Sequence, residues 1–599
     1  MAQGKNIAAG GRGTGKYGAA GEKPRHSRLT LLRMLSYLGQ DRGLMYAVAV
    51  LVIVGIACSL IGSYMLRPII NDYILPGDVP GLVRILALLA AVYLAGVICV
   101  LIQSRLLNKI GQRAVARMRA DLFSKMERLP VRYFDTHEYG DLMSRYTNDM
   151  DRVSDTLTDS LADIVSSALT LVGTLVMMLY ISPLLTVVVL VMVPIMYFSA
   201  KYIVKRSRKY FAAQQAALGG LNGYIEEMIS GQKVIKVFGH EKQVVEGFGA
   251  LNTELNDKSQ NAQFYSGLMM PFMQNLNTLN YVVVTIVGGL LAIFRGFDVG
   301  GLASFLQYSR QFGRPINELA SLYNNIQAAI AGAERIFQVI DEEPEPADSP
   351  HAVALTHVKG DVKMEDVQFE YDPGKPILKG ISLHADPGCK IALVGATGAG
   401  KTTIMNLLPR FYDILSGGIT IDGHPITDIQ RSSLRRTMAI VLQDTHLFTG
   451  TVRENIRFGR LEATDEEVVA AARLTAAHSF IRRLPRGYDT LLENDGANLS
   501  AGQRQLLNIA RAAVADPSIL LLDEATSNID TRSEILIQKG LDQLMEGRTS
   551  LIIAHRLSTI RNAHLILVLE NGRIIERGTH EQLLAGKGRY YSMYREQFE

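Results

Sequence analysis

The sequence has little cysteine and little excess charge of either sign. Cys58, Cys99 and Cys389 are the only cysteines among 599 residues, too few and too widely spaced for a disulfide framework or a metal cluster. The 62 basic and 58 acidic residues leave a formal net charge of +4, which provides no whole-protein field for attracting nucleic acid. We therefore expect reduced thiols without a chemical role and no nucleic-acid partner.

The first residues lack the apolar core of a secretory signal. Residues 1–28 are rich in Gly, Ala, Lys and Arg, which predicts a disordered cytosolic tail. A nucleic-acid-binding arm is an alternative, but the excess of positive charge on the cytoplasmic side of membrane proteins explains the same composition more simply. Residues 29–38 then carry leucines at helical spacing, which predicts a short helix along the membrane surface.

Long apolar segments occupy much of the first half of the chain. Hydrophobic residues make up 48% of the sequence and the mean hydropathy is +0.12, which is high for a wholly soluble protein. A stretch of about 20 apolar residues is long enough to cross the hydrocarbon layer as a helix. We place six such spans at residues 44–66, 85–102, 161–181, 184–203, 268–294 and 302–322.

The residues between these spans predict their orientation. Only Ser182 and Pro183 separate the third and fourth spans, a tight turn that we expect outside the cell. The long segments after the second and fourth spans are rich in Lys and Arg, which marks the cytoplasmic side. Buried core helices are the alternative, but the charge asymmetry is consistent across all six spans. Each long segment also contains a glycine-containing break, at residues 134–142 and 225–231.

The last two spans carry polar side chains at helical spacing. A charged residue at membrane depth is unfavourable unless it faces water, a partner or the bundle interior. Methionines at 269, 270 and 273 lie beside the polar positions of the fifth span, and their flexible thioethers suit a surface that accepts varied ligands. Hydrogen bonding between helices is an equal alternative for any single residue. As a set they predict a substrate cavity lined by Gln274, Asn277, Gln307, Arg310, Gln311, Arg314 and Asn317.

The second half of the chain has the pattern of a nucleotide-binding domain. Residues 338–354 are acidic and rich in proline, which predicts a linker, and strand patterns begin after it. The apolar strand at 390–394 leads directly into G-A-T-G-A-G-K-T at 395–402 and then a helix. This is the context of a phosphate-binding P-loop, in which Lys401 reaches the β and γ phosphates and Thr402 ligates Mg²⁺. We predict a membrane domain at 29–335, a linker at 336–358 and an ATP-binding domain at 359–599.

Two further motifs follow the P-loop in order. They are L-S-A-G-Q at 499–503 and I-L-L-L-D-E at 519–524, and together with the P-loop they resemble the ABC ATPases. The resemblance implies catalytic roles for Glu524, His555, Gln443 and Lys401. It implies Mg²⁺ ligation by Thr402, Gln443 and Asp523, and ATP binding by Tyr371, Gly395, Ala396, Thr397, Gly398, Ala399, Gly400, Lys401, Thr402, Thr403, Gln443 and Asp523.

In this family the signature motif closes over the nucleotide of an opposing domain. The residues concerned are Leu499, Ser500, Ala501, Gly502 and Gln503, with Asp530 in the neighbouring D-loop. A chain with one ATP-binding domain and six spans therefore resembles an ABC exporter half-transporter, which pairs with a second half-transporter. The implied fold is a membrane all-α domain with six transmembrane helices plus an α/β P-loop ATPase domain. The two glycine-containing breaks resemble coupling helices, and simple interhelical turns are the alternative.

Two runs resemble more narrowly the catalytically intact subunit of bacterial heterodimeric multidrug exporters. They are Y-S-R-Q-F-G-R-P-I-N-E-L at 308–319 and D-E-A-T-S-N-I-D at 523–530. The sequence departs from the common family pattern at Ala501 in the signature, at Asn528 and Ile529 in the D-loop, and at Asn494 just before the signature. The added methyl of Ala501 predicts weaker hydrolysis in the partner's site.

These patterns predict an ATP-driven exporter that moves amphipathic or hydrophobic compounds of the multidrug type by alternating access. A lipid or lipopeptide flippase and a nucleotide-gated regulatory membrane subunit are the alternatives. We expect ATP and Mg²⁺ as cofactors, and membrane lipid and a small hydrophobic substrate as partners. A second half-transporter is also expected, with a heterodimer favoured over a homodimer. The predicted location is the cell inner or plasma membrane with the ATPase domain in the cytoplasm.

Overall fold

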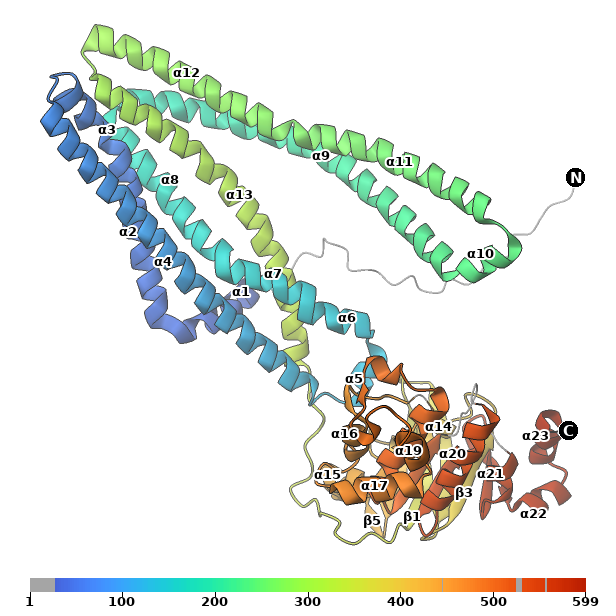
Figure 1. Cartoon of the computed structure of the whole chain (residues 1–599). Helices are drawn as coiled ribbons and strands as arrows, with labels where there is room; N and C mark the ends of the chain where they lie inside the picture. The colour runs from blue at the N-terminus through green and yellow to red at the C-terminus, as the bar shows by residue number, and fades with distance from the viewer. Residues whose placement is uncertain (1–26, 444, 524–529, 555–556, 599) are drawn as a thin grey trace, which may run out of the picture. The chain divides into compact units, whose positions relative to one another are not determined.

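A computed structural model of the chain divides into two compact units (Figure 1). The helical unit contains Met1–Glu127 and Tyr139–Glu342, and the α/β unit contains Arg128–Glu138 and Glu343–Glu599. The structure describes residues 27–443, 445–523, 530–554 and 557–598.

The helical unit consists of long helices joined by short turns. Its helices are α1 (Ser27–Leu38), α2 (Arg42–Tyr64), α3 (Leu66–Pro68), α4 (Val79–Met126), α6 (Tyr139–Ser144), α7 (Met150–Asp155), α8 (Leu161–Ile181), α9 (Pro183–Ser230), α10 (Gln232–Phe238), α11 (Glu241–Gly267), α12 (Met269–Arg295) and α13 (Val299–Asp341). Helices α4 and α9 have 48 residues each, which corresponds to roughly 70 Å at 1.5 Å per residue. Both therefore extend well beyond a hydrocarbon layer about 30 Å thick.

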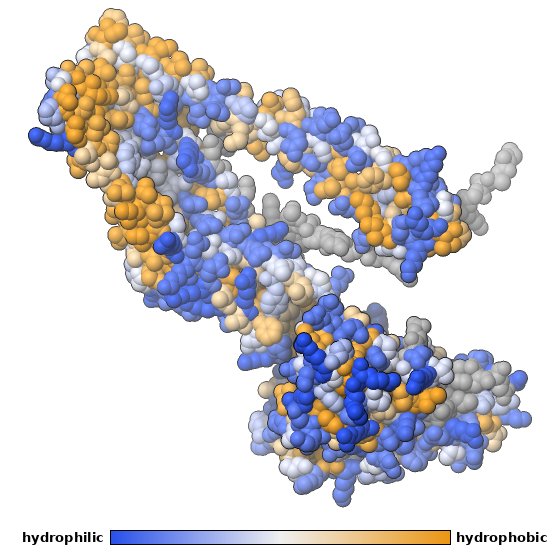
Figure 2. Space-filling view, in the orientation of Figure 1, coloured by the Kyte–Doolittle hydropathy of each residue, from blue (hydrophilic) through white to orange (hydrophobic). Residues whose placement is uncertain are grey.

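Five helical stretches in the described residues are long and apolar enough to cross a membrane. They contain the first five predicted spans, and they run over Ser27–Ile74, Val79–Met126, Tyr139–Ile181, Pro183–Ser230 and Glu241–Arg295. The sixth predicted span lies in α13, which is long enough but more polar than the other five. Figure 2 shows the apolar surface concentrated over the end of the helical unit that contains the α2–α4 and α12–α13 connections.

Side-chain caps fix where several of these helices begin. Ser182 accepts a hydrogen bond from the Leu185 backbone at the start of α9 (3.4 Å), and Pro183 occupies the first turn, where its missing N–H costs nothing. Asp298 caps α13 and forms an ion pair with Arg67 (2.7 Å). The predicted turn between the third and fourth spans is thus present in the structure.

Both predicted breaks are found at helix ends. In the first, α5 (Val131–Thr136) lies within the α/β unit and α6 begins at Tyr139 in the helical unit. In the second, α9 ends at Ser230, and α10 follows and ends at Phe238, where Gly239 caps it with a φ of +66° that suits glycine. The boundaries differ in two places from the predicted ones. Helix α13 continues to Asp341, so residues 336–341 are helical, and α1 already includes Ser27 and Arg28.

The α/β unit is built on a six-stranded sheet in the order β12-β11-β3-β10-β9-β6. Five strands are parallel and β12 is antiparallel at one edge. The strands of this sheet are β3 (Lys390–Gly395), β6 (Met438–Val441), β9 (Ile519–Asp523), β10 (Thr549–Ile553), β11 (Leu565–Glu570) and β12 (Arg573–Gly578). A four-stranded antiparallel sheet consists of β1 (Val362–Glu370), β2 (Pro376–Ala385), β4 (Ser416–Ile421) and β5 (His424–Pro425), and a two-stranded one of β7 (Gly450–Thr451) and β8 (Leu491–Leu492).

Alternate side chains of the central strands pack into two separate cores. On β3, Ala392 and Val394 join the core formed with α16, α17, α19 and α20, whereas Ile391 and Leu393 join the core formed with α14 and the antiparallel sheet. This alternation follows from the strand repeat of two residues. Besides α5, the α-helices of this unit are α14 (Lys401–Leu407), α15 (Arg431–Arg436), α16 (Val452–Arg457), α17 (Asp465–Leu474), α18 (His478–Ile481), α19 (Ala501–Val514), α20 (Thr531–Leu544), α21 (Leu557–Arg561), α22 (His580–Ala585) and α23 (Arg589–Phe598).

Candidate functional site

The glycine-rich loop connects the buried strand β3 to helix α14. Gly398 and Gly400 have φ of +82° and +101°, a region that side chains other than glycine rarely adopt. The Lys401 side chain is folded back on this loop, where its Nζ donates hydrogen bonds to the carbonyl oxygens of Gly395 (2.7 Å) and Ala396 (3.0 Å). Gly395, Ala396, Thr397, Gly398, Ala399 and Gly400 thus form the loop predicted from the sequence.

Lys401 is only 8% exposed, although its charge makes burial costly. Burial lowers the pKa of its ammonium group, and the nearby Asp523 carboxylate partly opposes this shift. The two carbonyl acceptors carry no formal charge. A phosphate group at the loop would place negative charge directly against this buried cation, so the site fits a nucleotide phosphate.

Oxygen-bearing side chains lie at the same edge of the sheet as the P-loop. Asp523 ends β9, and Gln443 lies two residues beyond the end of β6, whose Val441 pairs with Leu522. Strand order β3-β10-β9-β6 places all these carboxyl ends on one edge. With the exposed Thr402 they offer the hydroxyl, amide and carboxylate oxygens that Mg²⁺ prefers.

Tyr371 follows β1 and belongs to a cluster of aromatic rings. Its hydroxyl donates to Thr403 Oγ1 (3.3 Å), and its ring meets that of Tyr412 edge to face, with centroids 5.0 Å apart. Tyr371 is half-buried, so part of its ring remains accessible. The two catalytic candidates Glu524 and His555 lie outside the described residues, as do Asn528 and Ile529.

The signature motif forms the beginning of helix α19. Ser500 Oγ accepts from the Gln503 backbone (3.3 Å), and Gln503 Oε1 accepts from the Ser500 backbone (3.0 Å), a capping box that fixes the first turn. Leu499 and Gly502 are buried, whereas Ala501 is exposed. Asp530 caps α20 in a similar way by accepting from the Ser533 backbone (2.9 Å).

Two structural contacts near the ATP site were not predicted from the sequence. Gln505 of α19 accepts a hydrogen bond from the Thr445 hydroxyl and donates to the Leu442 carbonyl (3.5 Å), which ties the segment around Gln443 to the signature helix. The hydroxyl of Tyr412 donates to Asp135 of α5. No sequence motif signals either contact, because the partners are 60 and 277 residues apart.

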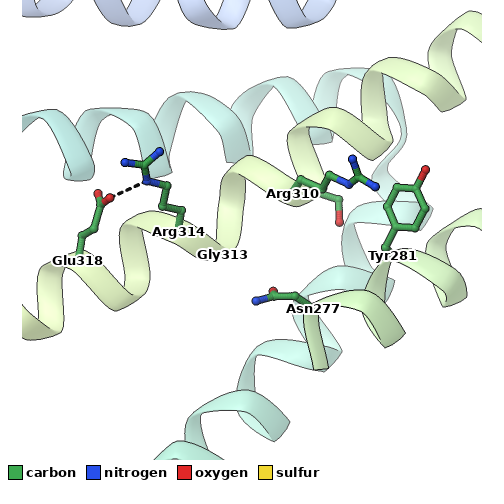
Figure 3. Close-up of a pocket in the computed structure, with 7 residues that line it drawn as sticks. Asn277, Tyr281, Arg310, Gly313, Arg314 and Glu318 are labelled. Carbon is green, nitrogen blue, oxygen red and sulfur yellow. Dashed lines mark hydrogen bonds and ion pairs between the residues drawn. The ribbon is translucent and has the colours of Figure 1, made fainter. Parts of the chain in front are cut away.

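The helical unit contains a large apolar cavity between α9, α12 and α13. Its volume is about 820 Å³, and methionines 192, 196, 269, 270 and 273 contribute to its lining. A polar pocket of about 340 Å³ adjoins it and is lined by Asn277, Tyr281, Ser309, Arg310, Gly313, Arg314 and Glu318 (Figure 3). Helix α9 also contributes to the lining, from Val189 to Val204. This contribution was not predicted from the sequence, because the cavity was identified by polar residues at helical spacing and α9 has no such stripe in this range.

The structure separates the residues that the sequence grouped into one cavity. Asn277, Arg310 and Arg314 line the polar pocket. Gln311 instead donates from Nε2 to Ser63 Oγ of α2 (2.9 Å), because it lies on a different face of α13 from the arginines. Neither of the two cavities is lined by Gln274 or Gln307, and the side chain of Asn317 is outside the described part of the structure.

Comparisons with known proteins agree with this architecture. Residues 45–316 match the family model described as "ABC transporter transmembrane region", and residues 378–527 match the family model described as "ABC transporter". A bacterial Atm1-family ABC exporter with ATP bound superposes with a TM-score of 0.74 at 29% identity, over 93% of this chain and 98% of that one.

Relatives resemble the chain over most of its length. The ABC transporter ATP-binding protein YfiC of Bacillus subtilis is 47% identical over 96% of both chains. A fatty acid ABC transporter ATP-binding/permease protein of Mycobacterium bovis is 45% identical over 87% of this chain and 83% of its own. An ATP-dependent lipid A-core flippase of Syntrophus aciditrophicus is 36% identical over 97% and 98%. The chain therefore belongs to the ABC transporter family, as a membrane-embedded exporter half-transporter whose cytoplasmic ATPase domain is coupled to transport.

Proposed function

We propose that this half-transporter exports amphipathic compounds that have a long apolar part. The observation that carries the proposal is the methionine-lined cavity with an adjoining polar pocket. A cavity of this size suits a small-molecule or lipid ligand, and methionine side chains adapt to apolar groups of different shape. Drugs of the multidrug type and lipids both have such parts. The names of the mycobacterial and Syntrophus relatives favour lipids.

Reconstitution into vesicles tests this proposal. ATPase activity is measured with a fluorescent acyl lipid and with a cationic amphipathic dye, and movement of each compound across the bilayer is followed. We expect at least one of them to stimulate ATP hydrolysis and to move in an ATP-dependent way. Replacing Met273 by Glu, which places a charge in the apolar cavity, should reduce both effects. If neither compound stimulates ATP hydrolysis or crosses the bilayer in an ATP-dependent way, the proposed export of amphipathic compounds is contradicted.

We also propose roles for the residues of the ATP site. Lys401 and the loop amides bind the phosphates, Tyr371 stacks on the adenine, and Glu524 orients the attacking water. His555 contacts the γ-phosphate. Thr402, Gln443 and Asp523 hold Mg²⁺, which neutralises charge on the phosphates when it is bound. The buried, carbonyl-bonded Lys401 and the oxygens at one sheet edge support these assignments.

ABC exporters function as dimers, and we propose that the partner here is a different half-transporter. The intact set of ATP-site residues, combined with the altered signature at Ala501, supports an asymmetric pair. Helix α10 supports docking on a partner chain, because its apolar side chains Val234, Val237 and Phe238 are exposed. A stable homodimer of this chain with two equally active ATP sites and full transport activity would contradict the proposal of a heterodimer.

A further inference from the structure

We propose that the polar pocket between α12 and α13 binds an anionic headgroup while the adjoining methionine-lined cavity holds the acyl chain of the same molecule. The inference rests on the proposed export of amphipathic compounds and specifies their charge. The transported compound would then be an acidic lipid or another amphiphile with a carboxylate, phosphate or sulfate group.

The two cavities adjoin each other. Asn277, Ser309 and Gly313 line both of them. Gly313 lies at their junction, where an added Cβ would be 3.0 Å from Asn277 Oδ1, closer than an ordinary contact. The missing side chain therefore lets Asn277 of α12 pack closely against α13 at this boundary, and the shared lining allows one molecule to contact both cavities.

The polar pocket has an excess of positive charge. Arg310 and Arg314 face it together with one carboxylate, that of Glu318. Figure 3 shows Arg310 beside the Tyr281 ring and Arg314 directed toward Glu318. The Arg310 guanidinium lies 4.3 Å from the Tyr281 ring centroid, which orients the cation without neutralising it.

The single carboxylate is already held by two donors. Arg314 Nε donates to Glu318 Oε1 (2.7 Å), and the Ser167 hydroxyl of α8 donates to Oε2 (3.0 Å). This ion pair uses only the Nε of Arg314, whose side chain is 84% exposed. Among the described residues its two terminal nitrogens have no hydrogen-bond acceptor. A planar guanidinium presents these nitrogens in a geometry that matches carboxylate and phosphate oxygens.

The junction also contains an unsatisfied polar atom. Asn280 is 5% exposed, and its Nδ2 donates to Ser309 Oγ (3.1 Å). Its Oδ1 has no hydrogen-bond partner among the described residues, although a buried polar atom without a partner is unfavourable. Asn280 lines the apolar cavity, and its partner Ser309 lines both cavities, so this amide places polar groups where the apolar cavity meets the polar pocket.

Lys201 of α9 is an alternative binding partner for the anionic headgroup. It lines the apolar cavity and lies 5.9 Å from the Tyr197 ring centroid. One ammonium without a second cation or a shaped pocket is a weaker site than two guanidinium groups. The arginine pocket is therefore favoured, and replacement of Lys201 distinguishes the two locations.

The experiment uses the complete transporter in lipid nanodiscs and probes that share the oleoyl or oleyl chain. Oleate and oleoyl lysophosphatidylglycerol are anionic, oleoyl lysophosphatidylcholine is zwitterionic, and oleyl trimethylammonium is cationic. ATPase stimulation and direct binding are measured for each probe. We expect the anionic probes to act at the lowest concentrations, and comparison of the first two shows whether a carboxylate or a phosphate is preferred.

Replacement of Arg310 and Arg314 by Gln should raise the concentration of anionic probe that gives half-maximal stimulation. The expected change is about tenfold to a hundredfold, as for loss of hydrogen bonds to a charged group. Arg314→Lys should retain part of the preference for anionic over zwitterionic and cationic probes, because the positive charge remains. The matched control is Arg295→Gln at the other end of α12, which should leave both stimulation and basal activity unchanged.

Equal stimulation by all probes, unaffected by the arginine replacements, would overturn the inference and leave export of amphipathic compounds intact. A loss confined to Lys201→Gln would also overturn it, because the anion would then lie on α9. Absence of binding and stimulation for every probe would contradict the proposed function itself, and the inference with it.

Discussion

The hydroxyl of Tyr412 donates a hydrogen bond to the carboxylate of Asp135. Asp135 belongs to α5, the short helix of the first cytoplasmic break, and Tyr412 packs against Tyr371 at the predicted adenine position. Arg132 of the same helix donates to the Tyr371 carbonyl oxygen (3.3 Å). Burial and the hydrogen bond to Asp135 raise the pKa of Tyr412, so it keeps its proton and remains a donor. The chain segment that enters the α/β unit between α4 and α6 therefore contacts the tyrosine at the predicted adenine position directly.

Tyr412→Phe should reduce the stimulation of ATPase activity by transported compounds while ATP binding is largely retained. The ring still packs against Phe369 and Tyr371, but a hydrogen bond to a charged group is lost, which contributes about 1.5–3 kcal/mol. ATPase rates with and without substrate measure the effect. Tyr591→Phe on α23 is the control and should change neither rate. Unaltered stimulation in Tyr412→Phe would show that this contact does not transmit substrate binding.

Lys401→Ala should weaken ATP binding about tenfold to a hundredfold, because it removes charge-assisted hydrogen bonds to the phosphates. Binding of a fluorescent ATP analogue to the purified transporter measures this change. Lys375→Ala is the matched control, since Lys375 is an exposed lysine of the same unit and forms an ion pair with Asp372. Equal affinity of the Lys401 and Lys375 variants would remove Lys401 from the phosphate site.

Two glycines of the P-loop should differ in their tolerance of alanine. Both have positive φ, so a side chain at either position costs about 1–2 kcal/mol of backbone strain. An added Cβ at Gly398 meets nothing within 4 Å, whereas one at Gly400 would lie 2.6 Å from Leu378 Cδ2. Gly400→Ala should therefore reduce ATP affinity and thermal stability more than Gly398→Ala. The reverse order would contradict this account of the loop.

Glu524→Gln should slow ATP hydrolysis by about 10²–10⁴-fold and leave ATP binding intact, because the attacking water loses its orienting carboxylate. In the proposed heterodimer this single replacement should silence nearly all hydrolysis, since the competent site uses Glu524 of this chain. Single-turnover hydrolysis and nucleotide binding separate the two effects. Residual activity near one half would point instead to two equivalent sites.

Much of the ATP site could be predicted because its motifs are local in sequence. The strand, loop and helix around Lys401 are consecutive, and backbone conformation there depends on glycines at fixed positions. The caps at Ser500 and Asp530 likewise involve residues only three apart. Contacts such as those of Gln505 and Tyr412 could not be predicted, because they depend on which elements the fold brings together.

The sequence by itself determined five membrane spans, the P-loop ATPase domain and the need for a second half, since hydropathy and short motifs act over neighbouring residues. It also placed polar residues on α13, because the helical repeat is fixed at 3.6 residues per turn. Only the tertiary structure decided which neighbour each of them meets. Arg310 lies against Tyr281 of α12 and lines the polar pocket together with Arg314, while Gln311 hydrogen-bonds to α2. The physical reason is that periodicity defines the faces of a helix, whereas the packing of other helices decides what each face contacts.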